Sequence, residues 1–345
     1  MRRAIDLARQ GSGNVSPNPL VGAVLVKDDR IIGEGYHQQF GGPHAEVHAI
    51  RNARESTQGA TLYVNLEPCS ITGKTPPCTE AIIKAGISRV VVAMKDPNPK
   101  VNGAGISTLQ KHGIEVVLGE GEKEAYHLNR FFITHMILHR PFVTLKMALT
   151  LDGWLAETSG KSKWITNDLS RQWVHEKRSG YDAVLVGAGT IIQDDPSLTA
   201  HGEGKNPWRI IIDPEAKIHP DAKVIRSNRD EKTWVICKKN RGDHLPVKTS
   251  PILSDNSEKN VRTLLTHLNT AGITSLWVEG GAQTFSHFLK SGCIDEIHIF
   301  YAPKLLGSGL SPFRGNWPVQ QEWPLRLTRV EVFGDDVLHS YVWGE

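Results

Sequence analysis

Cysteine is scarce in this chain, which has four in 345 residues, at Cys69, Cys78, Cys237 and Cys293. Four are too few for the disulfide framework of a chain of this size, so they indicate a reduced compartment and leave metal binding open. The sequence also has no run approaching the roughly 18 consecutive apolar residues of a membrane helix. We therefore expect a cytoplasmic protein with no membrane partner.

An excess of one charge is also missing. Lys and Arg together number 40 against 37 Asp and Glu, which leaves a formal net charge of +3. This small excess is not gathered into a basic stripe, so we expect no nucleic-acid partner. What the chain does have is length and 39% hydrophobic residues, enough for a substantial core and more than one typical domain.

Strand-like and helix-like segments alternate along the whole chain, which is typical of an α/β fold. In the first half, apolar runs at 61–66 and 89–94 predict strands on either side of a helix at 78–85. A helical stretch that begins at Glu122 stops before Pro141, where a new strand pattern runs to Thr150. The sequence therefore predicts two α/β domains, 1–140 and 141–345.

The first half contains a set of residues that suits a catalytic zinc ion. His44-Ala45-Glu46 opens a predicted helix, Cys69 follows a strand, and Cys78 begins another helix nine residues later. Three protein ligands leave one position of the metal open, while Glu46 stays uncoordinated and moves protons. The His-Ala-Glu sequence alone also fits an ordinary helix start, and the two cysteines alone also fit small buried apolar residues. Together they predict one zinc ion per chain on His44, Cys69 and Cys78, with Glu46 as the catalytic acid and base.

The deaminase signature H-x-E with P-C-x-x-C is matched except that eight residues separate the cysteines here. The segments HAEVHAI, LYVNLEPCSITGKTPPC and AMKDPNPKVNGAGI resemble the deaminase domain of the RibD family of bifunctional riboflavin-biosynthesis enzymes, over Met1 to about Gly119. A long loop between the cysteines is a feature of that family. The resemblance implies a cytidine-deaminase-like α/β/α domain.

The same resemblance implies a phosphoribosylated pyrimidine as substrate. A phosphate is bound by a cation and by hydroxyl or amide donors. Asn18 lies between two prolines and also fits a turn, while Lys74 also fits a solvated position. Ile71 stands where the family usually has histidine, so no phosphate contact is carried over to it. The substrate residues implied for this domain are Asn18, His37, Ser70 and Lys74.

Two glycine-containing turns stand out in the second half, at 185–190 and 278–284. Glycine lets the backbone approach a phosphate, and a helix that starts there presents free N–H groups to it. Neither turn has the G-x-G-x-x-G pattern of a dinucleotide-binding βαβ unit, so each also fits an ordinary tight turn. Lys146, on the first strand of this half, is a candidate catalytic proton donor or an outward-facing strand lysine.

The segments LKMALTLDG, SKWIT, KRSG, VGAGTIIQDDPSLT and VEGGAQTFSH resemble the reductase domain of the same family. The resemblance implies a dihydrofolate-reductase-like α/β fold that uses NADPH. His201 stands where relatives usually have arginine, which removes one expected phosphate contact. The implied substrate residues are Ser162, Arg178, Leu198 and Glu279. The implied cofactor residues are Ala148, Trp164, Thr190, Asp194, Gly281, Ala282, Gln283, Thr284, Phe285, Ser286 and His287.

Family resemblance thus predicts two successive activities. The first is hydrolytic deamination of 2,5-diamino-6-(5-phosphoribosylamino)pyrimidin-4(3H)-one to 5-amino-6-(5-phosphoribosylamino)uracil, and the second is NADPH-dependent reduction of the ribosyl group to ribityl. The alternative is a nucleobase or tRNA zinc deaminase whose C-terminal half is a non-catalytic binding or dimerisation module. We expect a small phosphoribosyl pyrimidine and further copies of the chain, in a homo-oligomer, as partners.

Overall fold

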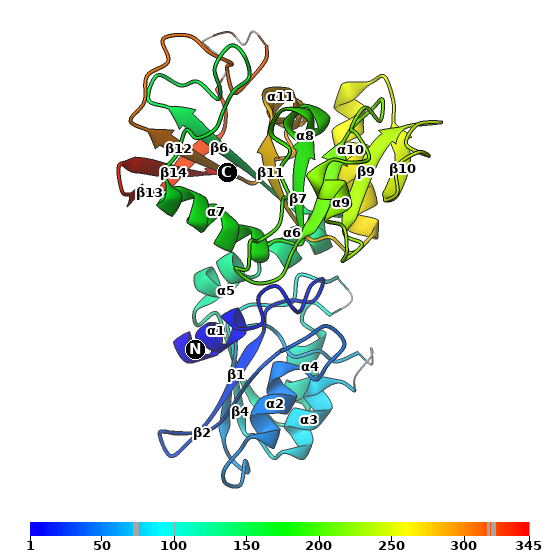
Figure 1. Cartoon of the computed structure of the whole chain (residues 1–345). Coiled ribbons are helices and arrows are strands. Elements are labelled where there is room, and N and C mark those ends of the chain that lie inside the picture. The colour runs from blue at the N-terminus through cyan, green and yellow to red at the C-terminus, as the bar shows by residue number, and fades with distance from the viewer. Residues whose placement is uncertain (72–75, 100, 316–317, 319–321, 345) are drawn as a thin grey trace. The chain divides into compact units, whose positions relative to one another are not determined.

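The computed structural model describes residues 1–71, 76–99, 101–315, 318 and 322–344. The chain divides into two compact units, Met1–Arg140 and Pro141–Glu345 (Figure 1). Each unit has one sheet with helices packed against it, which confirms the predicted α/β class. No helix of the described residues combines the length and the apolar character needed to cross a membrane.

The N-terminal unit is built on a five-stranded sheet with the order β2-β1-β3-β4-β5. β1 is antiparallel to β2 and to β3, whereas β3, β4 and β5 are parallel. The carboxyl ends of the three parallel strands therefore lie at the same edge. The strands are β1 (Gly22–Lys27), β2 (Arg30–Tyr36), β3 (Thr61–Val64), β4 (Arg89–Val92) and β5 (Glu115–Leu118).

Helices cover both faces of this sheet (Figure 1). Alternate residues of β1 point to opposite faces, as the period of a strand requires. Val24 packs with Ala4 and Leu7 of the first helix, while Leu25 packs in the larger core on the other face with Ala49. The helices are α1 (Arg2–Arg9), α2 (Ala45–Arg51), α3 (Cys78–Lys84), α4 (Ala104–Lys111), α5 (Glu122–Leu128) and α6 (Arg130–Leu138).

The helical stretch predicted from Glu122 to the domain boundary is two helices, α5 and α6, separated at Asn129. The Asn129 amide accepts a hydrogen bond from the N–H of Leu20 and donates one to the carbonyl of Leu20, at 2.8 and 3.0 Å. This contact joins residues that are 109 positions apart. A local sequence pattern therefore could not predict the break between the two helices.

The C-terminal unit is built on a nine-stranded sheet with the order β10-β9-β8-β7-β11-β6-β12-β14-β13. All neighbours are parallel except β14, which is antiparallel to β12 and to β13. β6, the first strand in sequence, is central and mostly buried. The strands are β6 (Phe142–Thr150), β7 (Ala183–Gly187), β8 (Trp208–Ile212), β9 (Thr233–Lys238), β10 (Lys248–Leu253), β11 (Ser275–Gly280), β12 (Glu296–Ala302), β13 (Leu325–Phe333) and β14 (Asp336–Trp343).

The main core of this unit lies between the sheet and α10 and α11, with Leu145, Leu185, Val278 and Phe285 fully buried. On the opposite face, Val174 of α7 packs with buried residues of β12 and β14. The helices are α7 (Asp168–Ser179), α8 (Ala188–Asp194), α9 (Lys223–Arg226), α10 (Ser257–Thr270) and α11 (Ala282–Ser291).

Three strands of this sheet, β10, β13 and β14, were not predicted from the sequence, and neither were the short helices α8 and α9. β13 is an edge strand whose apolar side chains Leu327 and Val332 are 50% and 70% exposed. The two residues Gly334-Asp335 join it to β14 as a tight hairpin, for which Gly-Asp is a sequence signal.

Candidate functional site

The three predicted metal ligands meet in the N-terminal unit. His44 directly precedes α2, Cys78 is the first residue of α3, and Cys69 lies in the segment after β3. Their ligand atoms all lie within 4.8 Å of one another. The Nδ1 atom of His44 lies 3.2 Å from the Sγ atom of Cys78 and 3.5 Å from that of Cys69.

These distances fit a tetrahedral zinc ion. With zinc–nitrogen and zinc–sulfur bonds of about 2.0–2.3 Å, tetrahedral ligand atoms are separated by roughly 3.5 Å. The hydrogen bond with Cys78 lowers the pKa of Cys69 to about 4, while donation of that bond and burial raise the pKa of Cys78. A metal that binds both sulfurs displaces any thiol proton from them.

Glu46 lies on the first turn of α2 next to this triad and is 3% exposed. Burial raises the pKa of its carboxyl group to about 7. Its Oε2 atom is buried and has no hydrogen-bond partner among the described residues. A carboxyl group that exchanges a proton near neutral pH and has a free oxygen beside an open metal position suits general acid and base catalysis.

Asn18 and His37, two of the implied substrate residues, contact each other near the triad. The Nδ1 atom of His37 lies 3.0 Å from the carbonyl oxygen of Pro43, which can only accept, so Nδ1 carries the proton. Nε2 then accepts a hydrogen bond from the Asn18 amide at 3.0 Å. The His37 ring packs edge-on against His44 with ring centres 5.4 Å apart. This arrangement fixes the orientation of the Asn18 amide.

The remaining implied residues of this half lie in the loop between the cysteines. Ser70 is half-buried directly after Cys69, and Ile71 is 44% exposed. Lys74 lies outside the described residues. The structure therefore brings Asn18, His37 and Ser70 to the neighbourhood of the triad and gives no position for Lys74.

Glu67, which sequence reasoning missed, binds backbone groups close to the predicted metal ligands. It is 3% exposed and stands two residues before Cys69. Its carboxylate accepts four backbone N–H groups, from Asp96 and Gly103 at Oε2 and from Gly105 and Ile106 at Oε1, at 2.9–3.2 Å. These bonds hold the first turn of α4 and the end of β4 against the cysteine loop. The sequence signal was the glutamate in Leu66-Glu67-Pro68-Cys69.

Asn65 was also missed and fixes the segment that carries Asn18. Its Oδ1 atom accepts the N–H of Gly22 at 2.8 Å, and its amide donates to the carbonyl of Leu20 at 2.9 Å. Asn129 binds Leu20 from the other side. Two asparagine side chains thus hold the backbone just after Asn18.

In the C-terminal unit the implied cofactor and substrate residues surround one cavity of about 1230 Å³. It opens at the carboxyl ends of β6, β7 and β11, where parallel sheets bind their ligands. The cavity is lined by the cofactor residues Ala148, Trp164, Thr190, Asp194, Gly281, Ala282, Gln283, Thr284 and His287 and by the substrate residues Ser162, Arg178, Leu198 and Glu279.

Two implied cofactor residues have side chains elsewhere. Phe285 is fully buried in the core, and a Cβ atom on Gly280 would come within 3.0 Å of its ring. The hydroxyl group of Ser286 donates to the carbonyl of Ala282 and accepts the N–H of Arg314. Any contact of Phe285 or Ser286 with a cofactor would therefore come from the backbone.

Gly281 directly precedes α11 and lines this cavity with its backbone, because it has no side chain. We call this site the backbone cradle. A Cβ atom placed on it meets only the Oγ1 atom of Thr190, at 3.7 Å. α11 has ten residues, and its first N–H groups have no side-chain cap at Gly281. Free N–H groups at an uncapped helix start fit the pyrophosphate of a dinucleotide.

Lys146 lines the cavity from β6 and does not face bulk solvent. Burial lowers the pKa of its ammonium group, and the nearby Glu279 carboxylate partly opposes that effect. Its Nζ atom lies 5.8 Å from the centre of the Phe300 ring. A lysine with a lowered pKa gives up its proton more readily, so Lys146 suits the role of proton donor in this cavity.

Arg178 and Glu279, both implied as substrate residues, bind each other. The Nε and Nη2 atoms of Arg178 each donate to one carboxylate oxygen of Glu279 at 2.6 Å. The Nη1 atom donates to the carbonyl of Thr199 at 2.9 Å. The edge of the guanidinium that carries Nε and Nη2 is therefore occupied by Glu279.

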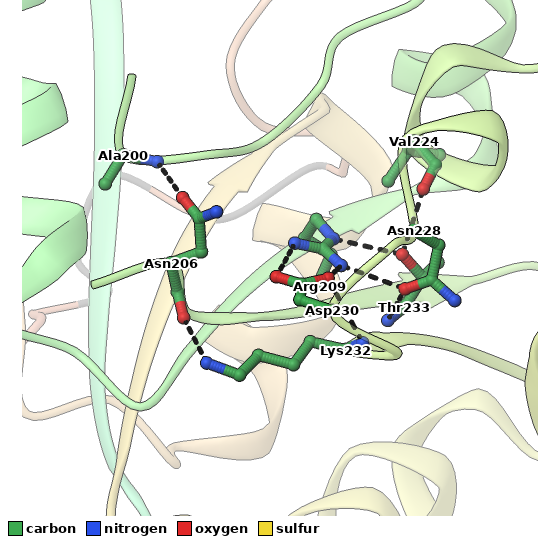
Figure 2. Close-up of polar contacts among 8 residues, drawn as sticks. All are labelled: Ala200, Asn206, Arg209, Val224, Asn228, Asp230, Lys232 and Thr233. Atoms are coloured by element: carbon green, nitrogen blue, oxygen red, sulfur yellow. Dashed lines mark hydrogen bonds and ion pairs between the residues drawn. The ribbon is translucent and has the colours of Figure 1, made fainter. Parts of the chain in front are cut away.

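A buried arginine that the sequence did not point to lies at the centre of a polar cluster in this unit (Figure 2). Arg209, on β8, is 1% exposed. Its guanidinium donates to both carboxylate oxygens of Asp230, to Oδ1 of Asn228 at 2.9 Å and to Oγ1 of Thr233 at 3.0 Å. Each nitrogen of the guanidinium thus has at least one acceptor, as the burial of a charge requires.

Figure 2 shows how this cluster reaches the cavity loop. Lys232, two residues after Asp230, donates its Nζ proton to the carbonyl of Asn206 at 2.8 Å. The Asn206 side chain accepts the N–H of Ala200 at 3.0 Å. Ala200 is therefore linked through Asn206 to Lys232, the residue that precedes β9.

Comparison with known families matches each half of the chain. Residues 1–94 match the model of the cytidine and deoxycytidylate deaminase zinc-binding region. Residues 141–339 match the model of the RibD C-terminal domain. The two matches fall in the two compact units, and together they contain every predicted site residue.

Similarity to single proteins extends over nearly the full chain. The riboflavin biosynthesis protein RibD of Aquifex aeolicus is 46% identical over 98% of this chain and 96% of its own length. That of Escherichia coli is 40% identical over 98% and 96%. A crystal structure from Thermotoga maritima, a diaminohydroxyphosphoribosylaminopyrimidine deaminase/5-amino-6-(5-phosphoribosylamino)uracil reductase, is 44% identical, covers 100% of this chain and 97% of its own, and superposes with a TM-score of 0.91.

Matches on both halves favour the bifunctional enzyme over a nucleobase or tRNA deaminase with a passive C-terminal module. They also confirm the predicted cytidine-deaminase-like N-terminal domain and a reductase C-terminal domain. The chain therefore belongs to the RibD family, which joins a zinc-binding deaminase domain to an NADPH-dependent reductase domain in riboflavin biosynthesis.

Proposed function

We propose that residues 1–140 deaminate 2,5-diamino-6-(5-phosphoribosylamino)pyrimidin-4(3H)-one and that residues 141–345 reduce the ribosyl group of the product with NADPH. The observation that carries the first step is the triad of His44, Cys69 and Cys78 with the unpartnered oxygen of Glu46 beside it. The triad would hold one zinc ion per chain, which would supply the Lewis acidity that lowers the pKa of a water molecule.

The protein's own part in deamination is proton transfer. Glu46 takes a proton from the attacking water and passes it to the exocyclic amine, which leaves as ammonia. Its raised pKa lets it both accept and return this proton near pH 7. Asn18, held by His37, and Ser70 orient the substrate by hydrogen bonds, and the family resemblance assigns Lys74 to its phosphate.

The observation that carries the second step is the cavity with the bare backbone at Gly281 and with Lys146 on its wall. NADPH bound in this cavity would supply the hydride for C1 of the ribose. As the C1–O bond of the sugar ring opens, Lys146 gives a proton to the ring oxygen, so that a ribityl chain results. Glu279 and Arg178 orient the sugar, and Trp164, Thr190 and Asp194 hold the cofactor.

Mass spectrometry of the products tests both steps in one experiment. Incubation of the diaminopyrimidine substrate without NADPH should give the deaminated phosphoribosylaminouracil. Addition of NADPH should then add two hydrogen atoms to that product. A product that is reduced but still carries the amine, or no deamination by zinc-loaded protein, would contradict the assignment.

We also propose that the protein works in the cytoplasm as a homo-oligomer on small pyrimidines. The four free cysteines support a reducing compartment. Sedimentation equilibrium of the full chain measures the oligomeric state. A monomer at all concentrations would contradict the second half of this proposal.

A further inference from the structure

Trp277 lies on β11 two residues before Glu279, and the two side chains contact each other. Successive side chains of a strand point to opposite faces, so residues two positions apart share a face. The Nε1 atom of Trp277 donates a hydrogen bond to the Oε1 atom of Glu279 at 2.9 Å. Glu279 lines the C-terminal cavity, whereas Trp277 is fully buried behind it. Trp277 therefore acts on a molecule in the cavity only through Glu279.

Three aromatic rings pack against the indole of Trp277. The ring centres of Tyr181, His298 and Trp173 lie 5.0, 5.6 and 6.1 Å from that of the indole. Two of these rings have further contacts: the Tyr181 hydroxyl is hydrogen-bonded to Oγ1 of Thr144 at 2.8 Å, and Trp173 packs edge-on against His298. A close-packed interior leaves a ring of this size little room to turn. The indole N–H is therefore a donor at a fixed place.

The carboxylate of Glu279 has room for one more hydrogen bond. A carboxylate accepts about four in all. Oε1 accepts the N–H of the Trp277 indole and the Nε–H of Arg178, whereas Oε2 accepts from Nη2 of Arg178. These three bonds are the ones that the carboxylate makes within the part of the chain that the structure describes. The remaining position is on Oε2.

Glu279 is ionised in this arrangement. Burial alone would raise the pKa of its carboxyl group. The charge and hydrogen bonds of Arg178, the charge of Lys146 and the hydrogen bond of Trp277 together hold that pKa below its ordinary value. An ionised carboxylate can only accept hydrogen bonds. The open position on Oε2 therefore suits an N–H or O–H group of a bound molecule.

We propose that Trp277 is a positioning residue of the reductase, whose indole N–H occupies Oε1 of Glu279 so that Oε2 alone is offered to the substrate. This inference rests on the proposed reductase function, in which Glu279 orients the sugar. Without the indole N–H, each carboxylate oxygen has one open position. A donor group of the substrate then binds either oxygen, so it is no longer held in one orientation.

An isosteric replacement separates this hydrogen bond from the packing of the ring. Benzothienylalanine, introduced at position 277 by a suppressor tRNA, keeps two fused rings but has sulfur in place of the N–H group. We expect the KM for the deaminated phosphoribosylaminouracil to rise about three- to tenfold, as for the loss of one hydrogen bond. The kcat and the KM for NADPH should stay within about twofold, because binding lost equally from ground and transition states changes the substrate KM alone. Trp277→Phe should show the same difference between the two KM values.

Trp173→Phe is the matched control, because it makes the same ring exchange in the same aromatic group and leaves the three bonds to Glu279 in place. Both of its KM values should stay within about twofold of the parent. An unchanged substrate KM in the benzothienylalanine protein would overturn the proposal. An equal rise in Trp173→Phe would also overturn it, since packing alone would then account for the effect.

Reduction of the deaminated intermediate by the parent chain is measured first. Absence of that reduction would overturn the reductase function and this inference with it, whereas parent turnover with an unchanged substrate KM in the benzothienylalanine protein contradicts only this inference. A rise of the NADPH KM equal to that of the substrate KM would also contradict it, because the whole cavity would then be disturbed. Ammonia release by the deaminase and the urea midpoint of tryptophan fluorescence check that both units of each variant are folded.

Discussion

Replacement of Glu67 by glutamine should destabilise the N-terminal unit and release its zinc at lower denaturant concentration. The side chain is nearly isosteric, but one carboxylate oxygen becomes an NH₂ group that can only donate. Whichever oxygen is replaced, two of the four backbone N–H groups that bind Glu67 lose their acceptor. These two N–H groups then face the NH₂ group of the glutamine, which is itself a donor. The side chain at this position is only 3% exposed.

The size of the effect follows from those two groups. An unsatisfied buried N–H costs about 1–3 kcal/mol, so the variant should lose about 2–6 kcal/mol of unfolding free energy. The lost negative charge at the start of α4 adds about 0.3–1 kcal/mol. A loss of this size is a large part of the roughly 5–15 kcal/mol that stabilises a typical domain.

Two probes separate the two units in this measurement. All nine tryptophans lie between Trp154 and Trp343, so tryptophan fluorescence in urea reports only the C-terminal unit. A colorimetric zinc chelator reports opening of the N-terminal unit. We expect the midpoint of zinc release to fall by about 1–3 M urea while the fluorescence midpoint stays the same.

Glu80→Gln is the matched control, because Glu80 is 55% exposed and lies 3.6 Å from Lys84 in a surface ion pair. Such pairs contribute about 0–1 kcal/mol, so both midpoints should stay close to those of the parent. Equal midpoints for Glu67→Gln and Glu80→Gln would refute the view that Glu67 holds the cysteine loop and α4 together.

Three further outcomes follow from the two sites. Elemental analysis should find one zinc per chain, and the double variant Cys69→Ser, Cys78→Ser should have none; zinc retained there would exclude this triad as the site. Glu46→Gln should abolish deamination, measured by ammonia release, while zinc content and reduction of supplied deaminated intermediate persist; loss of zinc instead would make Glu46 a ligand. Gly281→Val should weaken NADPH binding at least tenfold in a fluorescence titration, because its branched side chain fills the backbone cradle while Thr190 leaves room for its Cβ. Unchanged NADPH affinity would place the phosphates elsewhere.

Most of the core elements of the fold could be predicted from local patterns. The buried strands β7, β9 and β11 are short apolar runs, and α3 and α7 have regular apolar spacing. β13 could not be identified in this way, because it lies at the sheet edge and its apolar residues are exposed. The break between α5 and α6 depends on Asn129 binding Leu20, a contact that is remote in sequence.

The metal site was accessible from sequence because its chemistry restricts the residue types. Only a few side chains bind zinc, and His44, Cys69 and Cys78 occur at informative places. Glu67 and Arg209 bind other parts of the protein. The local signal for Glu67 is limited to its position two residues before Cys69, and no local pattern distinguishes Arg209 from an exposed arginine. The engagement of Arg178 by Glu279 could not be foreseen either, since each residue alone suits a polar ligand.

The strand order of the C-terminal unit bears on how the chain folds during synthesis. β6 is made first, yet it pairs with β11 and β12, whose partners Ser275 and Glu296 follow Phe142 and Thr144 by more than a hundred residues. Until those strands leave the ribosome, the central strand of the sheet has neither neighbour. High contact order of this kind slows folding and exposes apolar strands to aggregation. Ribosome stalling or truncation before Glu296 should therefore produce an aggregation-prone chain, for which chaperone binding during translation is the natural protection.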